Sequence, residues 1–391
     1  MTPSVAVARS LARQALEFKR DAPAVATQAR RLRHDSLFRM RNVTEGLLDR
    51  PSEAPLSHRL AVAGRILVAY GKAKRDQNAR SEHYRPSNEW LPIYRKPLKP
   101  LTTALEAGDS QALVVLLDQF FRSTVSAGLA GLPTDMTKNF FGKPPSRYRQ
   151  LQYLVDAVHR WRLLERLLPG VTAADLVIPD TGNPYGLMVD GSFIRAGADY
   201  QYYYAHKTVE LLAGERHPVI AELGGGIGGY AHFLARLMPA EATYINLDLP
   251  EILTVAQYLL MTALPQESFL LYGEVETLNA QSLAKSRLVL MPSFVIEELA
   301  DASVSLSFNS YSLAEMDPQT IRHYASEISR VTQTSIFHIN HVEQALLGAA
   351  DFGFDDRFAQ VESRRAEWNL GRNLRSDEFE FLLVDAEATK G

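Results

Sequence analysis

Apolar residues recur at spacings of three and four over most of the first 170 positions of the chain. This spacing places them on one face of an α-helix, so we expect helices there. The helical pattern covers residues 1–48, 60–70, 112–123 and 148–168. Residues 84–100 interrupt it with four prolines and the aromatic residues Trp90 and Tyr94, which predicts an extended loop. The first part of the chain is therefore predicted to be mainly helical.

From residue 195 onward, short apolar runs typical of strands alternate with helical segments. The predicted strands are residues 219–223, 244–247, 288–291, 304–308, 335–339, 358–363 and 378–383. The predicted helices are residues 200–212, 230–237, 251–264 and 318–331, and residues 269–285 resemble an insertion. The pattern predicts an α/β fold, with a Rossmann-like sheet of seven mostly parallel strands. We expect two domains, a helical one over residues 1–175 for substrate recognition or oligomerisation and an α/β one over residues 176–391.

The composition adds limits on the class of protein. Of the 391 residues, 46% are hydrophobic and 22% are charged, as in a soluble globular protein. No run approaches the roughly 18 apolar residues that a membrane span needs. The chain has no cysteine, which excludes disulfides, thiolate zinc sites and cysteine nucleophiles and fits a reducing compartment. We expect a cytoplasmic protein without a membrane span.

Charge is distributed unevenly along the chain. Residues 1–150 hold 25 Lys and Arg against 13 Asp and Glu, whereas the remainder holds 17 against 32. Either the basic half docks on the acidic half or on a neighbouring subunit, or it attracts an anionic substrate such as a phosphorylated sugar. The positive charges are scattered without a dense run, so we expect no nucleic-acid partner.

The most informative segment is residues 217–230, in which an apolar strand enters a glycine turn and a helix follows. Glycines allow positive φ and let a ligand approach the backbone at the end of the strand and the start of the helix. The spacing Gly224-x-Gly226-x-x-Gly229, with Asp248 19 residues later, satisfies the fingerprint of dinucleotide-binding folds. The turn alone therefore does not distinguish one nucleotide-like cofactor from another.

An acid before the turn favours a different cofactor. The spacing Glu222-x-Gly224-x-Gly226-x-Gly228 resembles the first motif of the class I S-adenosylmethionine-dependent methyltransferases. A carboxylate at Glu222 would repel a diphosphate but attract the ammonium of a methionine moiety. Asp248 then accepts the ribose hydroxyls, or it caps the helix that follows. The cofactor-binding residues predicted from these positions and the later strand ends are Glu222, Gly224, Gly226, Gly228, Asp248, Leu249, Ser293 and Asn309.

Further segments resemble a narrower group, the sugar O-methyltransferases of bacteria. The likeness rests on residues 248–252, 256–259, 290–292 and 309–316, and extends to 336–340 and 120–129. It implies S-adenosylmethionine as cofactor and methyl transfer to a hydroxyl of a sugar or glycosylated acceptor, a small-molecule substrate; self-association into a homo-oligomer stays open. Two departures concern the adenine contacts: Val304-Ser305 stand where an aromatic residue and an acid are usual, and no acid stands beside Ser293.

Two other functions stay open. One is methylation of a small molecule that is not a sugar, such as a phenolic natural product, which an acceptor pocket of aromatic residues without polar partners would favour. The other is a catalytically inactive scaffold that binds the cofactor. The two missing acids leave this second alternative open.

Methyl transfer to a hydroxyl requires alignment of donor and acceptor and a base for the hydroxyl proton. His341, after the fifth predicted strand, and Glu315, after the fourth, are the predicted catalytic residues. Tyr203, Tyr311 and Arg195 are the predicted substrate contacts, because they lie where the mouth of the cofactor site is expected. The fourth predicted strand does not end in the pair of acids that magnesium prefers, so we predict no metal.

Overall fold

The computed structural model describes residues 22–386, apart from residues 24, 88–89, 130–144, 344, 372 and 374. The beginning of the helical pattern predicted for residues 1–48 lies outside the described residues. In the described N-terminal part, residues 25–32 are helical, and the further helices are α2 (Met40–Gly46), α3 (Leu56–Gln77), α4 (Trp90–Arg95), α5 (Lys99–Ala107), α6 (Ser110–Leu117) and α8 (Arg147–Leu167). None of the helices in the described part of the chain is long and apolar enough to cross a membrane.

The prediction of an extended loop over residues 84–100 was partly wrong, because this segment contains α4 and the start of α5. Pro92 is the third residue of α4, and Pro100 is the second residue of α5. A proline in the first turn of a helix costs no hydrogen bond, since the N–H groups of that turn have no partner within the helix. Prolines were therefore evidence for helix starts here.

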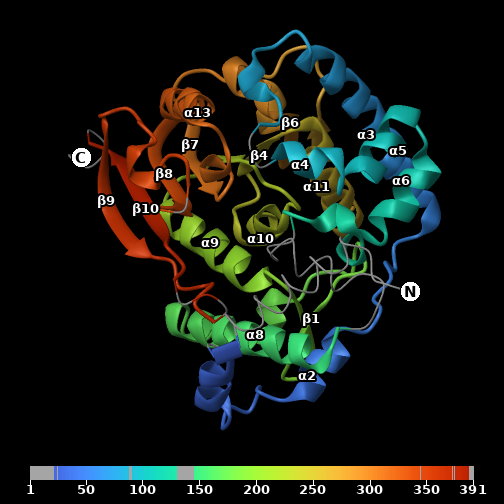
Figure 1. Ribbon diagram of the computed structural model, residues 1–391. Helices are drawn as coiled ribbons and strands as arrows, with labels where there is room; N and C mark the ends of the chain where they lie inside the picture. Colours follow the sequence, from blue (N-terminus) through green and yellow to red (C-terminus); the bar gives the residue numbers. More distant parts are fainter. Residues whose placement is uncertain are drawn as a thin grey trace, which may run out of the picture.

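The second part of the chain builds a single large sheet (Figure 1). Its strands, in spatial order, are β5 (Phe269–Leu271), β6 (Leu288–Pro292), β4 (Thr243–Asp248), β3 (Val219–Leu223), β7 (Val304–Ser310), β8 (Thr332–His341), β10 (Glu378–Asp385) and β9 (Phe358–Arg365). All neighbouring pairs are parallel except those of β10, which runs antiparallel to β8 and β9. The chain order reverses between β3 and β7, where ligands bind in sheets of this kind.

The fold class predicted from the sequence is confirmed: a Rossmann-like, mostly parallel sheet follows a mainly helical region. The sheet has eight strands rather than seven, because β5 within the segment predicted as an insertion pairs with β6. A small hairpin of β1 (Gly186–Val189) and β2 (Ser192–Arg195) was not predicted. The division into domains at residue 175 stays a prediction.

Helices cover both faces of the sheet and enclose two apolar cores. The remaining helices are α9 (Ala198–Leu211), α10 (Gly229–Leu237), α11 (Pro250–Ala263), α12 (Ala280–Ala284) and α13 (Pro318–Val331). Ile220 and Tyr244 point to the core beneath α9, α10 and α11, whereas Ala221 and Ile245 point to the core beneath α13. This alternation follows from the two-residue period of a strand.

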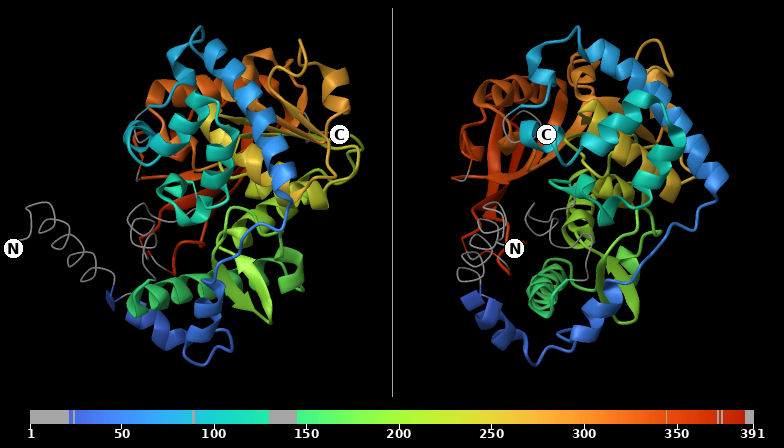
Figure 2. Two further views of the ribbon diagram at one scale, coloured as in Figure 1. Left: turned by 90° about the vertical axis from the view of Figure 1, so that its right-hand side faces the viewer. Right: turned by 45° about the vertical axis from the view of Figure 1, so that its right-hand side comes forward.

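Helices α3, α5 and α6 pack on the outer side of α11, whereas α8 packs against α9 (Figure 1). Both views in Figure 2 show the blue helix α3 beside the yellow α11. Nearly every residue of α11 is buried, because the sheet covers one side of it and α3, α5 and α6 cover the other. The two parts of the chain therefore share one continuous core.

Ion pairs connect the basic first part of the chain to the acidic second part. Arg65 pairs with Glu274 at 2.5 Å, and Arg80 pairs with Glu298 at 2.7 Å. Lys74 of α3 pairs with the buried Glu251 of α11 at 2.7 Å. Of the two explanations for the uneven charge, these contacts favour docking of the basic half on the acidic half.

Glu251 is the most buried of these acids and offers a test of the docking. It also accepts hydrogen bonds from Tyr94 at 3.0 Å and Tyr70 at 3.4 Å. We expect Glu251→Ala to lower the free energy of unfolding by about 2 kcal/mol, since Lys74 and both hydroxyls lose their acceptor. Urea denaturation measures this change. Glu106→Ala, at an exposed position of α5, is the control and should stay within about 0.5 kcal/mol of the parent; an equal midpoint for both variants would contradict the expectation.

Candidate functional site

A cavity of about 440 Å³ lies at the carboxyl ends of the parallel strands, where β3 and β7 diverge. The strand ends and the loops that follow them form one wall. Trp90 of α4 and Arg160 of α8 line it from the N-terminal part. The predicted site residues that line this cavity are Glu222, Gly224, Gly226, Asp248, Leu249, Ser293, Tyr311, Glu315 and His341. The structure thus brings together residues from five strand ends, those of β3, β4, β6, β7 and β8.

The glycine turn presents bare backbone to the cavity. Gly224 has φ of +76°, and a side chain there would overlap Ser312. Gly228, also at positive φ, is the N-cap of α10, whose first N–H groups have no partner within the helix. A residue with a Cβ at Gly224 would have to adopt a disfavoured backbone and displace Ser312. The turn therefore requires glycine for both conformation and space.

Two buried carboxyl groups lie below the turn. Glu222, at the end of β3, accepts a hydrogen bond from the hydroxyl of Tyr244. Asp248, at the end of β4, accepts the N–H of Gly226 at 2.9 Å and that of Leu249 at 2.7 Å. Burial raises the pKa of Glu222 to about 8, with a further rise from Asp248, and burial raises the pKa of Asp248 to about 7.

This acid pair lacks a compensating cation. Neither Glu222 nor Asp248 forms an ion pair with any Lys, Arg or His in the described part of the chain. Buried carboxylates are stable only when paired or strongly hydrogen bonded, so ionising both acids here is unfavourable. A bound cation, or a set of hydroxyl groups that donate hydrogen bonds, would stabilise the ionised acids and offset the free-energy cost of burying their charge. The pair is therefore suited to a ligand that brings positive charge.

His341 lies at the other end of the cavity and is held by an acid. Its Nδ1 lies 2.8 Å from Oδ1 of Asp377, the residue immediately before β10. The second oxygen of Asp377 accepts the backbone N–H of Glu343 at 2.7 Å, which fixes the carboxylate. A carboxylate on Nδ1 favours the tautomer whose Nε2 is free to accept a proton. This arrangement can act as a general base.

The loop after β7 brings two further predicted residues into the cavity. Glu315 accepts a hydrogen bond from Nε1 of Trp90 at 2.9 Å. Tyr311 has φ of +66°, uncommon for a residue other than glycine, and its ring centroid lies 6.0 Å from that of His341. The backbone N–H of Tyr311 donates to Ile339 at 2.8 Å, which holds the residue in this conformation.

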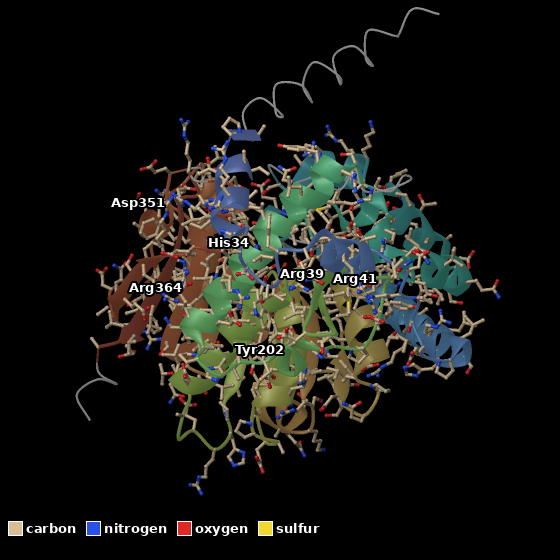
Figure 3. The ribbon with its side chains drawn as sticks, turned by 90° about the horizontal axis from the view of Figure 1, so that it is seen from below. His34, Arg39, Arg41, Tyr202, Asp351 and Arg364 are labelled. Carbon is tan, nitrogen blue, oxygen red and sulfur yellow. The ribbon has the colours of Figure 1, made fainter. Side chains whose placement is uncertain are left out.

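Four predicted site residues do not line the cavity. Gly228 is covered by α11, and the amide of Asn309 bonds to the backbone of Leu223 and to Ser312. Arg195 is buried one layer behind, where it donates to Gln201 at 2.6 Å. Tyr203 bonds instead to Arg364 of β9, which Figure 3 labels. Because none of these four residues lines the cavity, their contact with a ligand stays a prediction.

Other residues of the cavity were missed from the sequence. Glu378 and Asn369 come from the start of β10 and the segment before it, and Arg160 comes from α8, more than 200 positions earlier. Asp377, which contacts His341, was missed as well. Two consecutive acids at the start of the last predicted strand, Asp377 and Glu378, were an available signal, because an antiparallel last strand starts where the parallel strands end. Within the described part of the chain, no group of three or more His, Asp or Glu side chains gathers in a way that could hold a metal ion.

Comparison with known proteins gave similarities of structure only. No protein-family model and no curated protein sequence matches the chain. Among solved structures, a proposed O-methyltransferase from Klebsiella pneumoniae has a TM-score of 0.36 and 16% identity, over 59% of this chain and 97% of its own. Magnesium protoporphyrin IX methyltransferase from Synechocystis, solved with bound S-adenosylmethionine, has a TM-score of 0.32 and 14% identity, over 59% of this chain and 91% of its own. An S-adenosylmethionine-dependent methyltransferase from Aquifex aeolicus has a TM-score of 0.31 and 11% identity, over 49% of this chain and 94% of its own.

Proposed function

We propose that this protein is an S-adenosylmethionine-dependent O-methyltransferase that acts on a hydroxyl of a sugar or glycosylated acceptor. The observation that carries the proposal is one cavity with two unlike ends. One end holds a glycine turn above two buried carboxyl groups without a cation, Glu222 and Asp248. The other holds a histidine fixed by an acid, His341 with Asp377.

The residues at the first end fit this cofactor. Glu222 would face the ammonium group, and Asp248, whose oxygens each keep a free lone pair beside their backbone bonds, would accept the ribose hydroxyls. Gly226, where an added Cβ would meet only Leu129 at 3.9 Å, leaves room for a ligand against the backbone, and Gly224, Leu249 and Ser293 line the same end. A dinucleotide would bring a diphosphate towards two buried carboxyl groups, which like charge disfavours. The acid pair therefore supports a cationic cofactor over NAD.

The chemistry that the cofactor supplies is a methyl group on a positively charged sulfur. With the cofactor held at Glu222 and Asp248, Nε2 of His341 would take the proton of the acceptor hydroxyl whose oxygen receives the methyl group, and the cofactor would leave as a neutral thioether. Asp377 holds the imidazole in the required tautomer and stabilises the charge that the ring gains. Glu315, which accepts a hydrogen bond from Trp90, would accept one from another hydroxyl of the acceptor. The protein's part is alignment and proton removal.

The lining of the acceptor end favours a sugar over a phenol. Aromatic rings of Tyr200, Tyr311 and Trp368 are interspersed with Glu315 and Glu378. A phenolic acceptor would need mainly apolar and aromatic walls, whereas a sugar has both C–H faces for rings and several hydroxyls for polar groups. This mixture of aromatic rings and carboxylates suits an acceptor that carries several hydroxyl groups.

Cofactor binding should depend on pH in a defined direction. With pKa values of about 8 and 7, Glu222 and Asp248 are largely protonated at about pH 6 and ionised above about pH 8.5. A cationic ligand binds the ionised pair, so we expect the affinity for S-adenosylmethionine to rise about tenfold over this range, with release of protons. Calorimetry in buffers of different ionisation enthalpy measures both quantities. Constant affinity with no proton release would contradict the expectation.

Two experiments test the proposed function. Calorimetry with S-adenosylmethionine and with NAD separates the two cofactor classes, and binding of NAD alone would overturn the proposal. Release of S-adenosylhomocysteine, measured with a panel of sugars, glycosides and simple phenols, then identifies the acceptor class. Turnover of phenols without any turnover of sugars would replace the acceptor but keep the reaction.

A further inference from the structure

We infer that Glu378 is an acceptor-binding residue whose carboxylate receives two adjacent hydroxyl groups of a neutral sugar, so that the enzyme disfavours acidic sugars. The inference rests on the proposed function and adds its substrate class. It is carried by three observations: the hydrogen bonds that hold the carboxylate, its position opposite His341, and the balance of charge around it.

The carboxylate of Glu378 is held from behind by a chain of side chains. Glu378 is buried, with 6% of its surface exposed, and lines the cavity at the start of β10. Nδ2 of Asn369 lies 2.6 Å from one of its oxygens and 2.7 Å from the other. Oδ1 of Asn369 in turn accepts a hydrogen bond from Arg160 at 2.5 Å. The orientation of this acid is therefore fixed by residues of α8 and of the segment before β10.

Glu378 still has hydrogen-bonding capacity towards the cavity. A carboxylate offers about four lone pairs, and the single amide nitrogen of Asn369 uses one on each oxygen. None of the described residues forms an ion pair with Glu378, although it is buried. A buried carboxylate with only a neutral partner is costly unless further donors reach it. Two neighbouring hydroxyls of a sugar ring supply one donor to each oxygen.

The position of Glu378 connects this contact to the reaction. In the antiparallel pairing of β10 with β8, Glu378 lies directly opposite His341. Side chains of directly opposed residues lie on the same face, with Cβ atoms about 5 Å apart. A sugar held at Glu378 by two hydroxyls therefore presents the next hydroxyl of the ring near the imidazole. This separation lets Glu378 bind a sugar ring while His341 reaches a hydroxyl of the same ring.

The surrounding charge disfavours an anion at this end. Arg160 is the only buried arginine in the described lining of the cavity. It already pairs with two acids, Asp156 at 3.3 Å and Asp199 at 3.8 Å. Asp377, the residue before Glu378, adds a second acid at the start of β10. Arg85, the other arginine of the described lining, is exposed and donates to the carbonyl of Asn78. A carboxylate or phosphate held at Glu378 would therefore meet like charge. Neutral sugars are therefore preferred over uronic acids and phosphorylated sugars.

Glu378→Gln tests the inference with binding and turnover measured separately. The amide removes the negative charge and places an NH₂ group beside the NH₂ of Asn369. We expect binding of neutral hexoses to weaken about tenfold, and KM for the acceptor to rise by a similar factor, whereas the affinity for S-adenosylmethionine stays within about twofold. Ligand-observed NMR with glucose and galactose, in the presence of S-adenosylhomocysteine, measures acceptor binding without turnover. Glu367→Gln, at an exposed position beside Trp368, is the matched control and should bind as the parent does.

A set of related sugars gives the outcomes that decide the matter. Binding of glucose but not of glucuronate or glucose 6-phosphate to the parent, with loss in Glu378→Gln, supports the inference. Equal binding of glucose by parent and variant, preference for glucuronate, tighter binding of glucosamine than of glucose, or no binding of any sugar would each overturn it. Failure of the proposed function shows differently, as absence of S-adenosylmethionine binding in the parent protein.

Discussion

Glu222→Gln is expected to weaken the binding of S-adenosylmethionine about one hundredfold and, at about pH 8.5, to stabilise the ligand-free protein. The first effect follows from loss of a charge-assisted contact with the ammonium group, worth about 3 kcal/mol. The second follows because burial raises the pKa of Glu222 to about 8. The folded protein then opposes ionisation of this acid. Calorimetry measures the affinity, and thermal unfolding without ligand measures the stability.

The size of the stability change depends on pH, which makes the test specific. A carboxyl group whose pKa rises on folding binds its proton more tightly in the folded protein. Its contribution to stability therefore falls as pH rises from the unfolded pKa of about 4.5 towards about 8. At about pH 6 less than half of this loss has accumulated, because the unfolded chain is already ionised at Glu222 while the folded protein keeps the proton, so the variant should gain less there than at about pH 8.5. Glu241→Gln, at an exposed position before β4, is the control; lower stability of Glu222→Gln at both pH values would contradict the account of this site.

His341→Ala is expected to lower kcat between about one hundred and one thousandfold while leaving the affinity for S-adenosylmethionine unchanged. A positioned base accelerates proton transfer by about two to four powers of ten, and this variant removes it. Single-turnover release of S-adenosylhomocysteine with the acceptor found in the sugar panel measures the chemical step. Because the histidine lies at the acceptor end of the cavity, cofactor calorimetry separates loss of chemistry from loss of folding.

Two companion variants make the result for His341 interpretable. Asp377→Asn should lower kcat about tenfold to one hundredfold, since an amide can favour the wrong tautomer of the ring. His206→Ala removes a histidine that also lies near an acid, Glu210 of the same helix, but that does not line the cavity. It should turn over as the parent does. Full activity of His341→Ala would assign the proton to another group, with Glu315 the next to test.

Much of the fold was predictable because local signals agreed with the tertiary structure. Helix α13 begins and ends at the predicted residues, since Asp317 accepts the N–H groups of Gln319 and Thr320 and Pro318 opens the first turn. Strand β5 was missed because three residues are too few to show a period. The sequence also contained a signal for the β1–β2 hairpin that was overlooked. Asp190-Gly191 stands between two apolar runs, and both turn residues have positive φ.

The two ends of the candidate site differ in how far the sequence reveals them. Glu222, the glycine turn and Asp248 follow strands directly, so strand prediction alone brings them to one edge of the sheet. Glu378 and Arg160 meet only because α8 lies across the cavity and β10 runs against its neighbours. Their partners are separated by up to about 200 positions, a distance at which no periodic pattern carries information.

The position of β10 also orders the events by which the site comes into being. Among the strands of the described residues, β10 is synthesised last, yet it lies between β8 and β9 in the finished sheet. Asp377 and Glu378 arrive with it, whereas the glycine turn, Glu222 and Asp248 belong to strands made about 130 residues earlier. A growing chain can therefore complete the cofactor end while the acceptor end has neither the partner of its base nor the acid opposite it. The proposed methyl transfer would therefore require β10 to have entered the sheet.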